Sequence, residues 1–66
     1  MYFSDARLKE DIVRIGSTPA GVPFYEYTIF GRREKGVLAQ ELAITQPEAV
    51  SRHESDYLIV DYRKVR

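Results

Sequence analysis

Apolar and polar residues alternate in the first half of the chain, and the pattern predicts β-strands. The segment 12–15, IVRI, is rich in β-branched residues. In 24–30, FYEYTIF, Tyr25, Tyr27 and Ile29 alternate with the residues between them. The stretch GSTPAGVP (16–23) separates the two segments, and its glycines and prolines mark a turn. We therefore expect an antiparallel hairpin of 12–15 and 24–30.

After this hairpin, the pattern favours a turn, a short strand and one helix. GRREKG (31–36) is bounded by two glycines, so we expect a turn there. GVLA (36–39) is short and apolar and predicts a strand. QELAITQP (40–47) predicts a helix of about two turns. It should end near Gln46, because the residue before a proline avoids the α region.

The C-terminal segment AVSRHESDYLIVDY (49–62) predicts a second hairpin that turns around HESD (53–56). Its second strand, 57–62, is apolar on both faces up to Asp61, which favours a central strand or one covered by a neighbouring chain. The expected fold class is α+β, with four or five short strands, small antiparallel hairpins and one or two short helices.

Length and composition limit the size of the core and the kinds of site that the chain can form. Sixty-six residues form one domain, 1–66, whose core is small, and the chain has no cysteine that could add a disulfide or a thiolate metal site. His53 is the only histidine, so we expect no metal and no cofactor, and we interpret His53 as a turn residue. Oligomerisation is the remaining source of stability.

Ten basic and ten acidic residues balance, which argues against a nucleic-acid partner. No apolar run suits a membrane span or a signal peptide.

Ser4 and Lys9, in SDARLK (4–9), have two interpretations. Ser4 suits the N-cap of a short helix over 4–11, with Asp5 at the positive end of its dipole. Alternatively, Ser4 is a nucleophile and Lys9 the base that removes its proton, which requires a lowered lysine pKa. Lys9 would lie roughly 140° from Ser4 around a helix, and on the opposite face of a strand. A working pair needs an irregular entry to the helix or a lysine from a neighbouring subunit. Local geometry favours the cap.

Three other polar residues are candidates for chemistry or structure. Gln40 and Glu41 stand at the start of the predicted helix, where the dipole favours a glutamate. Asp61 is a charge inside an apolar strand and needs a partner. We expect that partner to be one of three basic residues near the N-terminus: Arg7, Lys9 or Arg14.

Taken together, several segments resemble one family. SDARLKEDI (4–12), GVLAQEL (36–42) with PEAV (47–50), and YLIVDY (57–62), in this order, are similar to the intramolecular chaperone auto-processing domain. This endosialidase-type domain lies at the C-terminus of phage tailspikes and tail fibres, and a relative occurs in a membrane-bound eukaryotic transcription factor. The resemblance extends from Ser4 to Tyr62.

The resemblance implies a homotrimer that aligns three copies of the upstream fibre chain and then cuts itself off as a serine peptidase. By this resemblance, Ser4 is the nucleophile, Lys9 the base, and Phe3–Ser4 the bond that is cleaved, once per chain. Asp5 supports the site. The positions of Gln40, Glu41 and Asp61 imply structural or interface roles. The expected locations are the virion tail fibre and the bacterial cytoplasm during assembly.

The chain is shorter than the family pattern at both ends, so we expect a short version or an excised piece of the domain. The alternative function is a structural or host-contact tip of a fibre or bacterial surface protein that does not cleave itself. In that case exposed aromatic residues would anchor the contact, and the candidates are Tyr25, Tyr27 and Tyr57.

Overall fold

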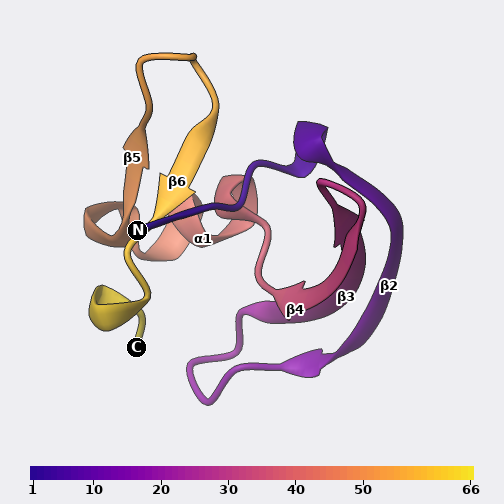
Figure 1. The fold of residues 1–66 in the computed structure, drawn as a ribbon. Helices are drawn as coiled ribbons and strands as arrows, with labels where there is room; N and C mark the ends of the chain where they lie inside the picture. The colour runs from indigo at the N-terminus through magenta and orange to yellow at the C-terminus, as the bar shows by residue number, and fades with distance from the viewer.

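The computed structural model describes all 66 residues and contains two three-stranded antiparallel sheets and one short α-helix, so the fold is α+β as expected (Figure 1). One sheet has the order β2–β3–β4, with bounds Lys9–Ser17, Pro23–Ile29 and Arg32–Gly36. The other has the order β1–β6–β5, with bounds Tyr2–Phe3, Leu58–Val60 and Val50–Arg52. The helix α1 spans Ala39–Thr45 and lies at the junction of the two sheets. None of the helices is long and apolar enough to cross a membrane.

The predicted first hairpin is confirmed. β2 pairs with β3 in antiparallel register, for example Arg14 with Tyr25, and a loop with Gly21 at φ 85° joins the strands. Strand β2 is longer than 12–15, because Lys9 already pairs with Ile29. Of the alternating tyrosines, Tyr27 is buried, with 4% of its surface exposed. It is therefore excluded as a surface contact residue.

The predicted helix over 4–11 is wrong. Only a single 3₁₀ turn, η1 (Ala6–Leu8), forms before β2 begins. Its N-cap is Asp5, whose carboxylate accepts a hydrogen bond from the Arg7 amide, and not Ser4. The only apolar side chains of the segment are Ala6 and Leu8, which are too few to give a longer helix an apolar face to bury.

The predicted turn over 31–36 is also wrong. Only Phe30 and Gly31 make the turn, with φ values of 50° and 74°, and 32–36 is strand β4. Four charged side chains alternate across the outer strand of a sheet, where charge blunts the exposed edge. Composition alone did not distinguish a charged edge strand from a charged turn.

The segment 36–39 is not a strand. Gly36 ends β4, Val37 and Leu38 are irregular, and Ala39 begins α1. The Leu38 carbonyl accepts the first helical hydrogen bonds, from Glu41 and Leu42. The helix ends as predicted, with Gln46 as its C-cap before Pro47.

The second hairpin is confirmed. β5 and β6 are joined by a turn that contains His53 and Asp56. β6 is the central strand of its sheet, as its apolar pattern predicts, because β1 pairs with its other edge. Strand β1 has only two residues and was missed, since a pair of residues carries no periodicity. Two more 3₁₀ turns, η2 (Pro47–Ala49) and η3 (Tyr62–Lys64), flank the hairpin.

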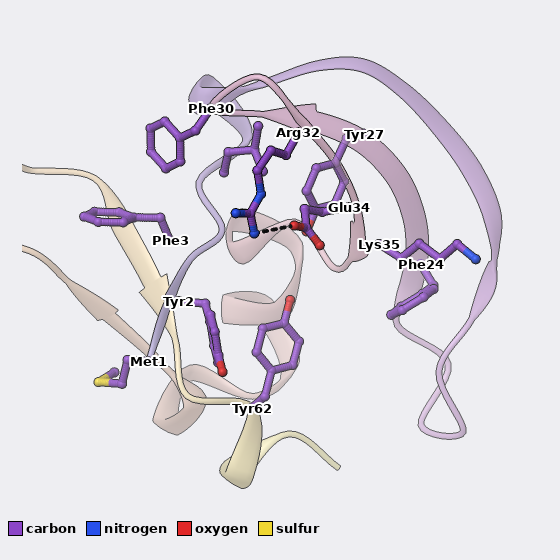
Figure 2. A pocket seen from close by; sticks show the side chains of 11 residues that line it. Met1, Tyr2, Phe3, Phe24, Tyr27, Phe30, Arg32, Glu34, Lys35 and Tyr62 are labelled. Carbon is purple, nitrogen blue, oxygen red and sulfur yellow. Dashed lines mark hydrogen bonds and ion pairs between the residues drawn. The ribbon is translucent and has the colours of Figure 1, made fainter.

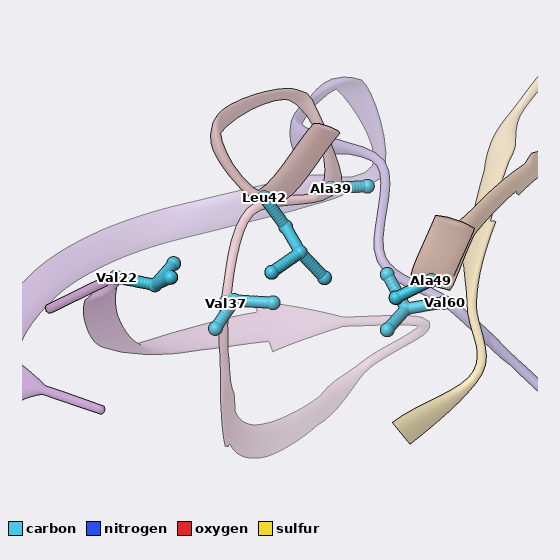
Figure 3. Close-up of a cluster of buried hydrophobic side chains, with 6 residues drawn as sticks. All are labelled: Val22, Val37, Ala39, Leu42, Ala49 and Val60. Atoms are coloured by element: carbon cyan, nitrogen blue, oxygen red, sulfur yellow. The ribbon is translucent and has the colours of Figure 1, made fainter. Parts of the chain in front are cut away.

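A small apolar core connects the sheets and the helix (Figure 3). Its members come from the β2–β3 loop, the segment before α1, α1 itself, η2 and β6: Val22, Val37, Ala39, Leu42, Ala49 and Val60. Five of the six are alanine or valine, so the buried apolar area is limited. Polar contacts therefore also help to hold the two sheets and the helix in place.

Gly36 is required by a close approach. A Cβ at this position would lie 2.5 Å from the hydroxyl of Tyr27 and 2.6 Å from that of Tyr62. We expect Gly36→Ala to lower the free energy of unfolding by about 1–3 kcal/mol, because the tyrosines must shift. Urea denaturation measures this change. Gly16→Ala is the matched control, since a Cβ at Gly16 meets no atom within 4 Å. Equal stability of the two variants would contradict the close contact.

Candidate functional site

The turn η1 brings Ser4 and Lys9 together within one chain. It separates Ser4 from the start of β2, so the two residues share neither a helix nor a strand. The Lys9 Nζ donates a hydrogen bond of 2.8 Å to the Ser4 Oγ. The chain thus has the irregular entry that a serine–lysine pair needs, and no neighbouring subunit is required to supply the lysine.

The backbone carbonyl of Val37 holds both groups of the pair. It accepts a 2.7 Å hydrogen bond from the Ser4 hydroxyl and a 2.6 Å hydrogen bond from the Lys9 Nζ. The Ala39 amide in turn donates to the Ser4 carbonyl at 2.9 Å. Because Val37 and Leu38 are not in a strand, this carbonyl is free to serve the pair.

Burial makes the pair chemically unusual. Ser4 is 1% exposed and Lys9 is 7% exposed. The Lys9 Nζ lies 3.9 Å from the centre of the Tyr27 ring, which shields it from water. Burial lowers the pKa of Lys9 to about 8, against the opposing effect of the Asp5 charge. Burial also raises the pKa of Tyr27 to about 12, so its hydroxyl stays neutral. Lys9 can therefore exist as a neutral base near physiological pH.

Asp5 anchors the site to the rest of the fold. Its carboxylate has no exposed surface and forms a bidentate ion pair with Arg7, with N–O distances of 3.0 and 2.8 Å. It also accepts hydrogen bonds from the Leu58 amide at 2.9 Å and from the Gln40 side chain at 2.8 Å. The Arg7 guanidinium beside it holds the pKa of Asp5 well below its usual range. One charge thereby connects η1, β6 and α1.

Of the helix-start pair, Gln40 belongs to the site. Its side chain donates to Asp5 and accepts a 2.9 Å hydrogen bond from the Ala6 amide. Glu41 does not reach the site. Its Oε1 is buried without a hydrogen-bond partner, and burial together with Glu41 raises the pKa of Tyr25. Gln40 and Glu41 thus have different surroundings, although sequence reasoning gave them the same role.

The expected partners of Asp61 are wrong. Asp61 pairs with Arg63, two residues later, at 3.0 Å, and caps η3 by accepting from the Arg63 amide. The arrangement repeats that of Asp5 and Arg7, since in both cases an aspartate caps a 3₁₀ turn and binds the arginine two residues on. A partner so near along the chain needs no tertiary contact, and it lowers the pKa of Asp61 to about 2.

An open cavity of about 740 Å³ lies beside the buried pair (Figure 2). Tyr27 and Phe3 line it, whereas Ser4 and Lys9 do not. Its wall is mostly aromatic and apolar, and Figure 2 shows Tyr2 and Tyr62 close to each other at one side, with their ring centres 5.8 Å apart. The serine hydroxyl is therefore close to this cavity but closed off from it.

Sequence reasoning missed three contributors to the site: Val37, Tyr27 and Leu58. Val37 and Leu58 act through backbone groups, whose positions no side-chain pattern reveals. Tyr27 was noticed as part of a strand, but its place over Lys9 depends on how β3 pairs with β2. No group of three or more histidine, aspartate or glutamate side chains is close enough to hold a metal ion.

Comparisons of the chain with protein-family models, with curated proteins and with solved structures found no match.

The lowered pKa of Lys9 makes stability depend on pH. An unfolded lysine titrates near 10.5 and Lys9 near 8, so the unfolded chain binds more protons between these values. The free energy of unfolding should then rise with pH, by about 2 kcal/mol between pH 8 and pH 10. Urea titrations across this range measure the rise.

Lys9→Met provides the matched comparison, because methionine fills a similar volume without a titrating group. We expect this variant to lose the rise between pH 8 and pH 10. Above about pH 10, unfolded tyrosines ionise while Tyr27 does not, which lowers stability and limits the useful range. A flat profile in the wild type, or the same rise in both proteins, would contradict a buried lysine that is easily deprotonated.

Proposed function

We propose that this domain is an intramolecular chaperone of a phage tail fibre or tailspike that trimerises and cleaves its own chain at Phe3–Ser4. Ser4 is the nucleophile and Lys9 is the general base. One observation carries the proposal. The Ser4 Oγ and the Lys9 Nζ are 2.8 Å apart, are both buried, and the lysine has a pKa lowered to about 8.

The three segments that resemble the family meet at this pair. The first, 4–12, supplies Ser4 and Lys9. The second, 36–42, supplies the Val37 carbonyl, and the third, 57–62, supplies the backbone of Leu58, which accepts from the Ser4 amide at 3.1 Å. Segments that resemble a self-processing domain in sequence are thus the ones that build one site. This convergence supports the proposal independently of the distance between Ser4 and Lys9.

The reaction follows from the groups present. Neutral Lys9 accepts the proton of the Ser4 hydroxyl as Oγ attacks the carbonyl carbon of Phe3. The bond between that carbon and the Ser4 nitrogen then breaks, and the nitrogen takes the proton from Lys9. The product is an ester between Phe3 and the Ser4 Oγ. Water hydrolyses this ester to give the Phe3 carboxylate and a free Ser4 hydroxyl and amine.

Burial restricts the reaction to the protein's own chain. Ser4 is 1% exposed and does not line the adjacent cavity, so an external peptide has no path to its hydroxyl. The carbonyl of Phe3, in contrast, is covalently attached to Ser4. We therefore expect one turnover per chain and no activity on added peptides.

Exposed apolar side chains support association between copies of the chain. Eight large apolar or aromatic residues remain 37–82% exposed: Met1, Tyr2, Ile12, Val13, Ile15, Phe30, Ile44 and Tyr62. A core limited to a few small side chains also gains from oligomerisation. In a trimer placed at the end of a fibre, this association would align three upstream chains during assembly, before the domain is released.

Self-cleavage is tested by fusing a soluble domain ahead of Tyr2 and measuring masses over time. The wild type should be cut between Phe3 and Ser4, whereas Ser4→Ala and Lys9→Met should remain intact. Because the neutral lysine is the base, the wild-type rate should rise about tenfold per pH unit below pH 8 and level off above it.

Thr45→Ala is the control for a hydroxyl removed elsewhere, since Thr45 is exposed at the end of α1, and it should be cut at the wild-type rate. If the wild type and all variants keep their intact masses, the proposed self-cleavage is wrong. The alternative of a structural or host-contact tip would then stand.

Trimerisation is tested by light scattering on the isolated domain at micromolar concentration. We expect the mass of three chains, and Ser4→Ala should give the same mass, because the hydroxyl is buried inside one chain. A stable monomer would contradict the chaperone role but not the cleavage reaction.

A further inference from the structure

The side chain of Phe3, which precedes the bond to be cleaved, is held between two aromatic rings from different sheets. The ring of Phe30, from the β3–β4 turn, lies 6.1 Å from that of Phe3 and nearly perpendicular to it, at 84°. The ring of His53, from the β5–β6 turn, lies 4.9 Å away at 64°. Both arrangements are the edge-to-face geometry that aromatic pairs favour. Figure 2 shows Phe3 and Phe30 beside each other at one end of the cavity.

The ring of His53 is fixed in place by its own turn. Its Nδ1 forms a 2.8 Å hydrogen bond with the Ser55 hydroxyl and accepts one of 3.1 Å from the Ser55 amide. The His53 backbone bonds to Tyr57 and Asp56, both at 2.8 Å. The His53 imidazole that contacts Phe3 is therefore held in one orientation by hydrogen bonds.

Phe30 occupies a position that neither the turn nor the core explains. It is the first residue of a two-residue hairpin turn in which both φ values are positive, 50° and 74°, and asparagine is favoured there. A bulky residue in this conformation is strained. Its side chain is also 69% exposed, so it contributes little to the core. The contact with Phe3 accounts for a phenylalanine at this position.

We infer that the cleavage site is selective for an aromatic residue on the acyl side of the scissile bond, and that Phe30 and His53 are the positioning residues that hold it. This inference rests on the proposed self-cleavage and names the class of bond that is cut. Strand β1 fixes the backbone of Phe3 by pairing it with Ile59, and the two rings fix its side chain. With both fixed, the carbonyl carbon of Phe3 has one orientation relative to the Ser4 hydroxyl. Such positioning contributes strongly to the rate of an intramolecular reaction.

The fusion protein described above also tests this inference. We expect Phe30→Asn to slow cleavage by about tenfold or more, although asparagine suits the turn better. Its melting temperature should equal or exceed that of the wild type, which separates positioning from stability. Phe30→Tyr should be cut at the wild-type rate, because tyrosine keeps the aromatic ring and the exposed position has room for the added hydroxyl. Phe3→Ala should slow cleavage similarly, and Phe3→Tyr should not.

Ile44→Asn is the matched control. Ile44 is 82% exposed on α1 and lines a separate small cavity. Because Ser4 and Lys9 of one chain form the cleaving pair, a contact of Ile44 with another copy does not enter the reaction, and removing its apolar side chain should leave the rate unchanged. A wild-type protein that is cut, together with a Phe30→Asn variant cut at the same rate, overturns this inference alone. A wild-type protein that is never cut overturns the proposed function, and the inference with it.

Discussion

The structure depends on one buried charge, the carboxylate of Asp5. A buried carboxylate is costly unless it is paired and hydrogen-bonded, and Asp5 meets this requirement by collecting donors from three parts of the chain. Arg7 lies in the turn that follows, the Leu58 amide lies in the central strand of one sheet, and Gln40 lies on the helix. These contacts draw the N-terminus, the helix and the C-terminal hairpin to one point. The apolar core has only six small to medium side chains, so these polar contacts act together with packing in fixing the arrangement.

The same constraint creates the serine–lysine pair. Because Asp5 caps a 3₁₀ turn instead of starting a helix, the chain makes a single tight turn between Ser4 and Lys9. This turn places the lysine amine against the Tyr27 ring and the Val37 carbonyl, where water is excluded. Exclusion of water weakens the hold of Lys9 on its proton, while the nearby carboxylate of Asp5 opposes this effect and keeps the pKa near 8. One aspartate thus shapes the geometry of the pair and also limits how far burial lowers the pKa of Lys9.

The features that sequence reasoning predicted correctly were those carried by local patterns. Alternation over 24–30 and the glycines and prolines before it placed the first hairpin, and Pro47 placed the end of the helix. Two of the errors share a cause, since each involved a segment whose role is set by contacts with another part of the chain. The charged stretch 32–36 became a strand because β3 pairs with it, and Val37 stayed irregular because its carbonyl serves Ser4 and Lys9. The partner of Asp61 proved to be local where a distant one was expected.

The sequence by itself determined the fold class, both hairpins and the candidates Ser4 and Lys9, because strand periodicity, turn residues and motif order can all be read along the chain. Only the tertiary structure decided whether the two candidates meet. A helix and a strand each keep residues five apart on different sides, so their meeting requires a turn that Asp5 stabilises through contacts from β6 and α1. Burial, which gives Lys9 its lowered pKa, likewise depends on residues far away in the sequence, Tyr27 and Val37. Proximity and desolvation are properties of the assembled fold, and no local pattern encodes them.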